Sequence, residues 1–271
     1  MKALIAPYDR DALRQQFQSA APFRFFKIEN FLDAGFADEV VQSYPTYEQA
    51  RALGGKEFDA VNEKLKIQVT DSAQFPSPVK QLADALSGPD FLADMEYITG
   101  IPSLLADAGY SGGGMHLTNK SGRLDVHVDF NFNDQLSAFR RLNILVYLNP
   151  VWEEAWGGNI ELWDSDVRKC WHSYSPIMNR CVVFETTKIS YHGVTPLKCP
   201  PSMARKSFAA YYYTKEPPAG WDGVKHSTIF RARPEEKVRE AILMPAENLK
   251  RGVSRVADQA KSALKGFLGR R

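Results

Sequence analysis

The sequence predicts a mainly β core with flanking helices, an α+β arrangement in which the strands form a sandwich or a jelly roll. Between residues 106 and 214, apolar and polar residues alternate with the period of two that is typical of strands. Before and after this stretch, apolar residues recur every three or four positions, as in amphipathic helices. Turn-forming residues divide the period-two stretch into short segments. Closely spaced short strands of this kind are typical of a double sheet with a cavity at one end.

Residues 1–105 are expected to form a helical and mixed layer that packs on this core. Helical spacing occurs in DRDALRQQFQSA, AGFADEVVQSYP and SPVKQLADALSG, the last two of which end at Pro45 and Gly88. Proline and glycine are common where helices stop, so these segments are predicted to be helices. The patterns at 23–31 and 64–70 indicate two strands within the same region.

Residues 106–215 are expected to hold the β core, which shares one integrated domain with the regions on either side. Each predicted strand has alternating character and is bounded by turn material such as NDQ, GG, PIMN or CPP. The predicted strands are 114–119, 124–131, 141–149, 158–164, 169–175, 180–186, 190–195 and 206–214.

Residues 216–271 are expected to form a C-terminal helical extension. Over 249–268 the apolar residues recur at helical spacing, and lysines and arginines stand between them. This pattern predicts a basic amphipathic helix. We interpret it as an outer helix packed on the domain, and the alternative is a helix that binds a membrane surface or a partner.

Composition excludes several classes of protein. The chain has 271 residues with 34 Lys plus Arg against 32 Asp plus Glu, a net charge of +2 that gives no reason to expect a nucleic-acid partner. No apolar run reaches the ~18 residues of a membrane span, and the N-terminus lacks the pattern of a secretory signal. Three cysteines without CxxC spacing indicate neither a disulfide framework nor a zinc finger. A cytoplasmic location is therefore expected.

The stretch RLDVHVDFN places a histidine and a carboxylate on one face of a predicted strand. His127 and Asp129 are two positions apart, so their side chains point the same way, about 7 Å apart at a rise of ~3.3 Å per residue. His192, in ISYHGVTPL, is the natural third ligand from a later strand. Two histidines and one carboxylate form the facial triad typical of non-haem Fe(II), which leaves positions open for a cosubstrate and dioxygen.

A second set of residues is suited to hold an anionic cosubstrate. Arg205 and Ser207 alternate on one strand face, and a guanidinium matches the fork of a carboxylate. Tyr147, on an earlier strand, places a phenol within reach of the same anion, and Asn143 shares its face. We therefore expect a dicarboxylate to bind with one end at the metal and the other at Arg205.

The ordered string HVDFN, RRLNILVYLNPVW, WGGNIELWD, RCVVFET, YHGV and ARKSFAAYYYT resembles the 2-oxoglutarate- and Fe(II)-dependent oxygenases, specifically their prolyl-4-hydroxylase-like branch, over about 108–214. The resemblance implies a double-stranded β-helix (jelly roll) and iron held by His127, Asp129 and His192. It also implies that Arg205, Ser207 and Tyr147 bind the far carboxylate of 2-oxoglutarate, with ascorbate as a reductant. One departure is Leu117, near the position where many members have a tyrosine that touches the cosubstrate.

The implied activity is hydroxylation of an unactivated C–H bond of a small molecule, amino acid or peptidyl substrate, with dioxygen consumed and 2-oxoglutarate converted to succinate. Two other classes stay open: a non-catalytic jelly-roll module that binds a metal or ligand, and a metal hydrolase. The remaining histidines, His116, His172 and His226, are interpreted as structural. His116 lies near enough to the expected cavity to contact substrate.

Overall fold

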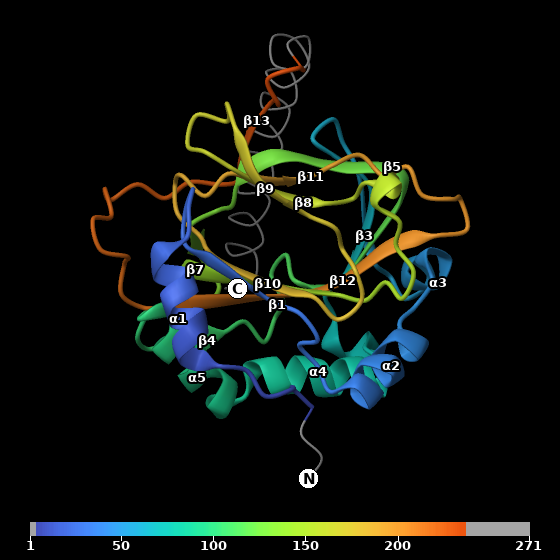
Figure 1. Cartoon of the computed structure of the whole chain (residues 1–271), viewed down its shortest axis with the longest axis horizontal. Coiled ribbons are helices and arrows are strands. Elements are labelled where there is room, and N and C mark those ends of the chain that lie inside the picture. The colour runs from blue at the N-terminus through green and yellow to red at the C-terminus, as the bar shows by residue number, and fades with distance from the viewer. Residues whose placement is uncertain (1–3, 237–271) are drawn as a thin grey trace, which may run out of the picture.

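The chain folds around an antiparallel sheet that curls back on itself, with helices along one outer side (Figure 1). This computed structural model describes residues 4–236. The helices are α1 (Arg10–Ser19), α2 (Ala34–Ser43), α3 (Tyr47–Ala52), α4 (Ser77–Ser87) and α5 (Pro89–Thr99), with 3-10 turns at Ser72–Gln74 and Glu154–Trp156. The strands are β1 (Phe25–Ile28), β2 (Lys56–Asp59), β3 (Glu63–Val69), β4 (Leu105–Ala106), β5 (Gly114–Val128), β6 (Phe132–Asn133), β7 (Ala138–Tyr147), β8 (Ile160–Trp163), β9 (Cys170–Tyr174), β10 (Cys181–Glu185), β11 (His192–Val194), β12 (Ala204–Thr214) and β13 (Ile229–Arg231).

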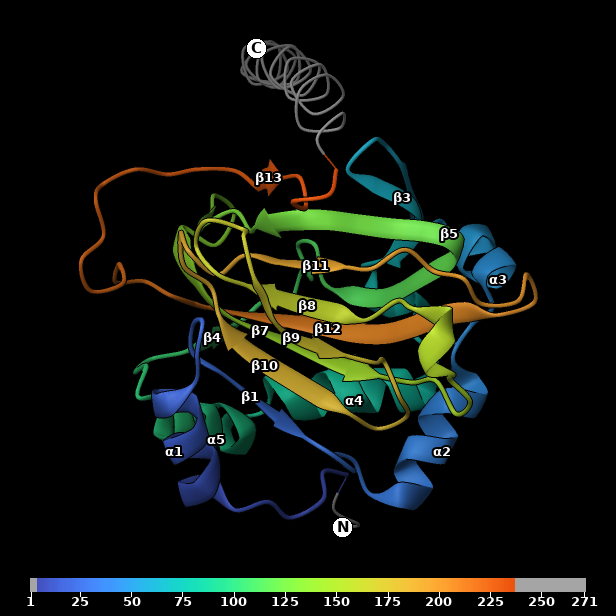
Figure 2. The same ribbon diagram turned by 45° about the horizontal axis from the view of Figure 1, so that its top comes forward.

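Two facing layers share the long strand β5. The strand order is β1-β10-β7-β12-β5-β11-β8-β9. The first part of β5 pairs with β12, and its last part pairs with β11, so the strand passes from one layer to the other. Figure 2 shows this turn in β5. The jelly roll predicted from the sequence is confirmed, but the segments predicted as separate strands at 114–119 and 124–131 form one bent strand that ends at Val128.

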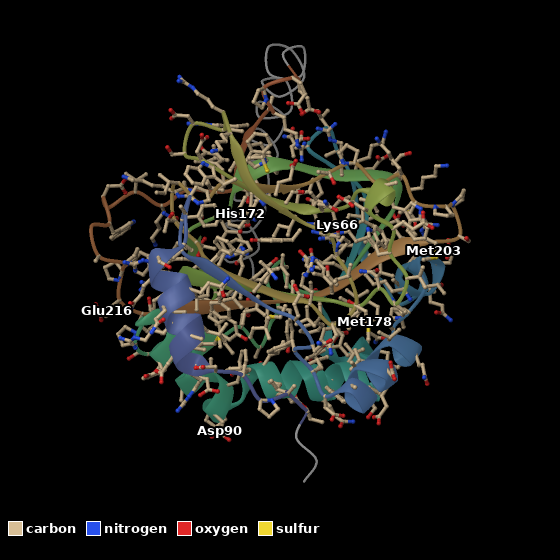
Figure 3. The ribbon with its side chains drawn as sticks, in the orientation of Figure 1. Lys66, Asp90, His172, Met178, Met203 and Glu216 are labelled. Carbon is tan, nitrogen blue, oxygen red and sulfur yellow. The ribbon has the colours of Figure 1, made fainter. Side chains whose placement is uncertain are left out.

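The apolar faces of the helices cover the outer side of the first layer. Val40, Leu82 and Ile98, from three different helices, are fully buried in one cluster with β7 residues such as Leu142 and Ile144. Side chains from the helices and from the sheet pack into this interface (Figure 3). This cluster lies behind the sheet, so it supports the first layer without occupying the space between the layers.

The helices α1, α2 and α4 confirm the three helices predicted from the sequence. Their ends follow local chemistry: Asp9 accepts hydrogen bonds from the backbone N–H groups of Asp11 and Ala12, and Gly88 follows α4. The helices α3 and α5 were not predicted. The first is short and begins at a capping box of Thr46 and Gln49, and the second begins directly after Gly88, where one helix ends and the next starts.

The short strands β2, β4, β6 and β13 were not predicted, because two to four residues give no measurable period. Among them, β2 forms a hairpin with β3, and β13 pairs with the end of β5. The helix predicted over 249–268 lies outside the described residues. In the part of the chain that the structure covers, no helix combines the length and apolarity needed to cross a membrane.

Candidate active site

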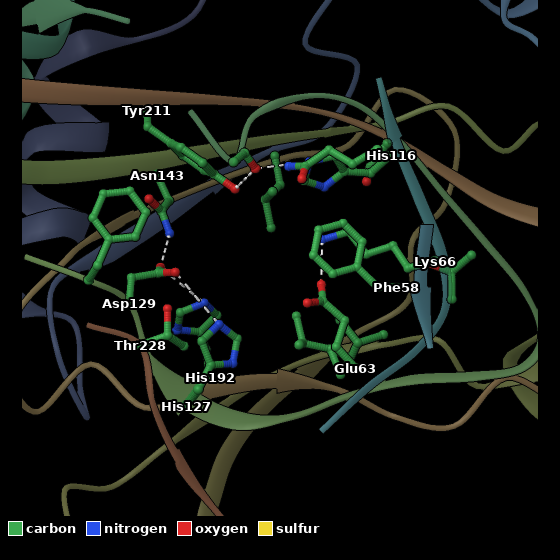
Figure 4. A pocket seen from close by; sticks show the side chains of 18 of the residues that line it. Phe58, Glu63, Lys66, His116, His127, Asp129, Asn143, His192, Tyr211 and Thr228 are labelled. Carbon is green, nitrogen blue, oxygen red and sulfur yellow. Dashed lines mark hydrogen bonds and ion pairs between the residues drawn. The ribbon is translucent and has the colours of Figure 1, made fainter. Parts of the chain in front are cut away.

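A cavity of about 820 Å³ lies between the two layers of the jelly roll. Its walls come from β3, β5, β7, β11 and β12, with the β2–β3 hairpin on one side and β13 on another. Figure 4 shows polar side chains from these strands pointing into it. All three predicted metal ligands line the cavity.

The structure brings His127, Asp129 and His192 together at one end of this cavity. One nitrogen or oxygen atom from each side chain lies within 4.8 Å of the others. His127 Nε2 is 3.7 Å from Asp129 Oδ1, and His192 Nε2 is 3.5 Å from Asp129 Oδ2. The convergence follows from strand pairing, because His192 on β11 lies directly opposite His127 on β5. These distances leave room for a small ion between the three donors.

Backbone carbonyls fix which nitrogen of each imidazole faces the cavity. His127 Nδ1 lies 2.9 Å from the carbonyl oxygen of Asp125, and His192 Nδ1 lies 3.0 Å from that of Ser190. A neutral imidazole whose Nδ1–H donates to a carbonyl presents the lone pair of Nε2 for metal binding. Burial, together with the neighbouring His127, lowers the pKa of His192 to about 3, so this imidazole is neutral at physiological pH.

Arg140 and Asn143 hold the Asp129 carboxylate. Asn143 Nδ2 donates to Asp129 Oδ2 at 2.7 Å, and its Oδ1 accepts from Nε and Nη2 of Arg140 at 2.9 and 2.7 Å. Arg140 Nη2 also lies 3.2 Å from Asp129 Oδ2. Burial alone would raise the pKa of the Asp129 carboxyl, but Arg140 and the two imidazoles hold that pKa well below its usual range. The carboxylate is therefore ionised and oriented.

Arg140 was not predicted from the sequence as a site residue. Arg140 is three positions from Asn143, and strict alternation puts such residues on opposite faces of a strand. A register irregularity in the pairing of β7 with β12 brings Arg140 to the cavity face, with Tyr213 opposite it. There its guanidinium lies 3.6 Å from the ring centroid of Tyr211. Asn143, which was predicted to bind cofactor, lines the cavity, and its side-chain hydrogen bonds go to Arg140 and Asp129; its contact with cofactor stays a prediction.

A separate set of polar groups surrounds Arg205, which lines the cavity together with Ser207. Its Nε donates to the carbonyl oxygen of Gly158 at 2.7 Å, and its Nη1 lies 3.4 Å from Ser207 Oγ. The Cζ of Arg205 lies 5.0 Å from the ring centroid of Tyr147, which is directly opposite Ser207 on the neighbouring strand. Burial raises the pKa of Tyr147 to about 12, with Arg205 opposing the rise, so the phenol keeps its proton.

Gly158 explains part of the WGG motif. Its φ of +70° is a backbone conformation that favours glycine, and an added Cβ would come within 3.2 Å of Arg205 Cδ and 3.0 Å of Trp152. The glycine thus allows its carbonyl oxygen to approach the guanidinium closely and fix its direction.

The donors present fit both an iron ion and a dicarboxylate. Two imidazoles and one carboxylate are the donor set of the facial triad. Within the described residues, Arg205 Nη2 and the Tyr147 hydroxyl are buried and make no hydrogen bond. Leaving a buried donor unpaired costs about 1–3 kcal/mol, more for a charged group, so this end of the cavity is suited to an anion that would accept from both.

The other histidines occupy different surroundings. His116 lines the cavity, where its Nε2 lies 2.8 Å from Gln68 Nε2. Its pKa is held well below the usual range, mainly by burial and also by the positive charges of Lys66 and Arg205. Leu117, the next residue, is fully buried in the cluster behind the sheet. The cavity face of this stretch is thus formed by His116 and Thr118, while Leu117 points the other way. His172, by contrast, bonds to the carbonyl oxygen of Ala21 outside the cavity.

Comparison with known proteins finds a family match for the part of the chain that contains this site. Residues 113–213 match the model of the 2OG-Fe(II) oxygenase superfamily. A curated relative, the mouse (Mus musculus) prolyl 3-hydroxylase OGFOD1, is 29% identical over 85 residues, which cover 30% of this chain and 15% of that protein. The match thus spans a small part of the relative's length.

Two solved structures share the fold. A prolyl hydroxylase in complex with a hypoxia inducible factor peptide, from Trichoplax adhaerens, has a TM-score of 0.55 at 18% identity, covering 75% of this chain and 88% of that one. A prolyl-4-hydroxylase from Pseudomonas putida has a TM-score of 0.53 at 17% identity, covering 74% and 98%. The fold, the order of the motifs and the family match agree. Residues 113–213 of this chain are thus similar to the 2OG-Fe(II) oxygenase superfamily.

Proposed function

We propose that the protein is a 2-oxoglutarate- and Fe(II)-dependent dioxygenase that hydroxylates a C–H bond of a small molecule, amino acid or peptidyl substrate. The observation that carries the proposal is that one cavity contains both a candidate metal site and a candidate site for a carboxylate. Three metal-ligand atoms lie within 4.8 Å of one another at one end, and a buried arginine with an unpaired donor lines the same cavity.

In this proposal His127 and His192 each bind Fe(II) through Nε2, and Asp129 binds it through a carboxylate oxygen. Arg205, Ser207 and Tyr147 bind the far carboxylate of 2-oxoglutarate by charge-assisted hydrogen bonds. When both are bound, iron and cosubstrate supply the oxidative chemistry, in which dioxygen and 2-oxoglutarate give succinate, carbon dioxide and a hydroxylated substrate.

The chain's own residues orient and shield this reaction. Arg140 and Asn143 keep the Asp129 carboxylate ionised and directed at the metal position. Phe230 of β13 lies with its ring centroid 5.3 Å from that of His127, and Phe184 lies 4.6 Å from His192. These rings exclude water from the back of both imidazoles, which strengthens the electrostatic interactions of the site.

The test is succinate formation by the purified protein supplied with Fe(II), 2-oxoglutarate and dioxygen. We expect succinate to form slowly without substrate and faster with it, and to require both iron and 2-oxoglutarate. A binding module would form none, and a hydrolase would act without the cosubstrate. Absence of succinate under all of these conditions would refute the proposal.

We also propose a cytoplasmic location. The support is that Cys170, Cys181 and Cys199 are all free, as expected in a reducing compartment. Fractionation of cells that express the protein tests this, and recovery in an oxidising compartment would contradict it.

A further inference from the structure

The wall that faces the triad across the cavity carries an ion pair. Figure 4 shows Glu63 and Lys66 of β3, with Phe58 of β2, opposite His127 and Asp129. Lys66 Nζ donates to Glu63 Oε1 at 2.8 Å, and the two side chains are only 14% and 12% exposed. Both residues line the cavity. Two opposite charges are thus held, largely shielded from bulk water, in the part of the cavity that faces the metal ligands.

A local backbone irregularity puts both charges on the same wall. Residues three apart on a regular strand point to opposite faces. Leu65 has φ of +51°, and the pairing of β3 with β5 shifts register between Lys64 and Lys66. A bulky residue in this conformation costs roughly 1–2 kcal/mol, and such strain concentrates at functional sites. Here its effect is to bring Glu63 and Lys66 into the cavity together.

The other charged residues that line the cavity are in ion pairs, belong to the proposed 2-oxoglutarate end, or lie exposed at the edge of the cavity. Arg123 is paired with Asp125 and Glu236, and Arg140 with Asp129. Arg205 lines the predicted anion end with Ser207. Lys56 stands at the exposed end of the hairpin, 4.9 Å from the Phe58 ring centroid. On the wall opposite the triad, Glu63 and Lys66 are therefore the shielded charges suited to meet a substrate.

We propose that Glu63 and Lys66 form a subsite for the head group of a small zwitterionic substrate, an amino acid or a molecule with the same ammonium and carboxylate. Glu63 receives the ammonium, Lys66 receives the carboxylate, and the remainder extends toward the triad past Phe58. This inference rests on the proposed function and names its substrate class.

The energetics favour a zwitterion over other ligands. Shielding the Glu63–Lys66 ion pair from water costs free energy. A substrate that leaves either charge without a partner would increase this cost. A zwitterion exchanges one ion pair for two charge-assisted contacts, and the net charge of the wall and ligand together does not change. A simple anion competes with Glu63 for Lys66, and an uncharged peptide segment offers neither charge a partner.

The experiment measures binding to the Fe(II)- and 2-oxoglutarate-loaded protein under anaerobic conditions by calorimetry. The probes are the twenty free L-amino acids, followed by the N-acetyl and C-amide forms of any that bind. We expect at least one free amino acid to bind and to stimulate succinate formation when dioxygen is admitted. Each blocked form should bind about 10-fold or more weakly, because each loses one hydrogen bond between charged groups, worth ~1.5–3 kcal/mol.

Variants assign each end of the head group. Glu63→Gln should remove the penalty for N-acetylation and keep that for amidation, and Lys66→Met should do the reverse. Lys64→Met is the matched control, since Lys64 is exposed on the same strand and outside the cavity lining, and it should keep both penalties. The comparison of ligand forms on the unaltered protein needs no variant, so a misfolded variant would not prevent the test.

Three results would overturn the inference. Blocked and free amino acids could bind equally well, both cavity variants could keep both penalties, or none of the free amino acids could bind while the loaded protein still forms succinate. Failure of the proposed function is a different result, namely no succinate from the unaltered protein at all. Calorimetric binding of amino acids would then still be measurable.

Discussion

Asp129 is the residue on which the two imidazoles and Arg140 converge. Its two carboxylate oxygens face His127 Nε2 and His192 Nε2, while Oδ2 also meets Asn143 and Arg140. In the proposed metal site, this carboxylate would supply the negative charge, and its contacts with Asn143 and Arg140 join it to β7. At the scale of single residues, the proposed site therefore consists of three proposed ligands and of residues that orient them.

Replacing Asp129 by alanine should abolish succinate formation and leave the fold largely intact. The side chain is part of the cavity and not of the apolar cluster behind the sheet, so its loss removes a ligand without opening the core. Asp134→Ala, an exposed position nearby, is the control and should keep full activity. Succinate assays with circular dichroism check this. Succinate formation by the Asp129 variant would mean that Asp129 is not a ligand.

Replacing Asn143 by alanine should weaken metal binding by about 10–100-fold, the usual cost of losing a group that orients a metal ligand. The variant cuts the bridge between Arg140 and Asp129 while leaving all three ligands in the chain. A titration with Mn(II) measures the change. A purely structural role for Asn143 would lower the melting temperature and leave the Mn(II) dissociation constant unaltered.

Replacing Arg205 by alanine should raise the KM for 2-oxoglutarate by about 10–100-fold, from the loss of ~1.5–3 kcal/mol of charged hydrogen bonding. Metal affinity should stay the same, because Arg205 does not contact the triad. Arg180→Ala, which breaks a surface pair with Glu29, is the control. An unchanged KM in the Arg205 variant would remove Arg205 from its proposed role.

At the scale of elements, two strand irregularities place charged residues in the cavity. One lies in β7 and brings in Arg140, and the other lies at Leu65 in β3 and brings in Glu63 beside Lys66. The sequence predicted His127 with Asp129 and Arg205 with Ser207, because alternation holds locally at those positions. It could not predict Arg140 or Glu63, because alternation alone puts each on the wrong face.

The strain at Leu65 gives an element-scale prediction. Leu65→Val should lower the free energy of unfolding by about 1–2 kcal/mol relative to Leu65→Gly, since a β-branched residue tolerates positive φ least. At this chain length, 1 kcal/mol corresponds to about 2–4 °C in melting temperature. Thermal unfolding measures the difference. Equal stabilities for the two variants would show that the strand relaxes at this position without cost.

For the whole molecule, the helical layer and the cavity lie on opposite sides of the first sheet layer. Leu82→Ala in α4 should reduce stability by about 2–5 kcal/mol, the cost of a cavity at a fully buried leucine. Gln81, the residue before Leu82, is exposed, so Gln81→Ala should change the free energy of unfolding by less than about 0.5 kcal/mol. Denaturant unfolding measures both, and Mn(II) affinity should stay unchanged. Weaker metal binding in Leu82→Ala would show that the helices couple to the site.

The jelly roll could be predicted from the sequence because its strands are many and its motifs keep a fixed order. The short strands and the helix α5 could not be predicted in this way. Strands such as β2 and β13 acquire their conformation by pairing with longer strands, and α5 follows α4 with a single glycine between. Their placement depends on tertiary contacts, which a local period does not record.

Because β5 runs without interruption from one layer to the other, it also fixes the separation between the two ends of the cavity. At Thr118 it pairs with Arg205, and at His127 it pairs with His192, so a single covalent segment separates the two anchor points proposed for the cosubstrate. We expect a keto acid one carbon shorter or longer to bind more weakly than 2-oxoglutarate, because it would fit the two proposed anchors less well. The backbone of β5 would thus select the cosubstrate by its length. Side chains on the other walls of the cavity could then vary without changing this selection.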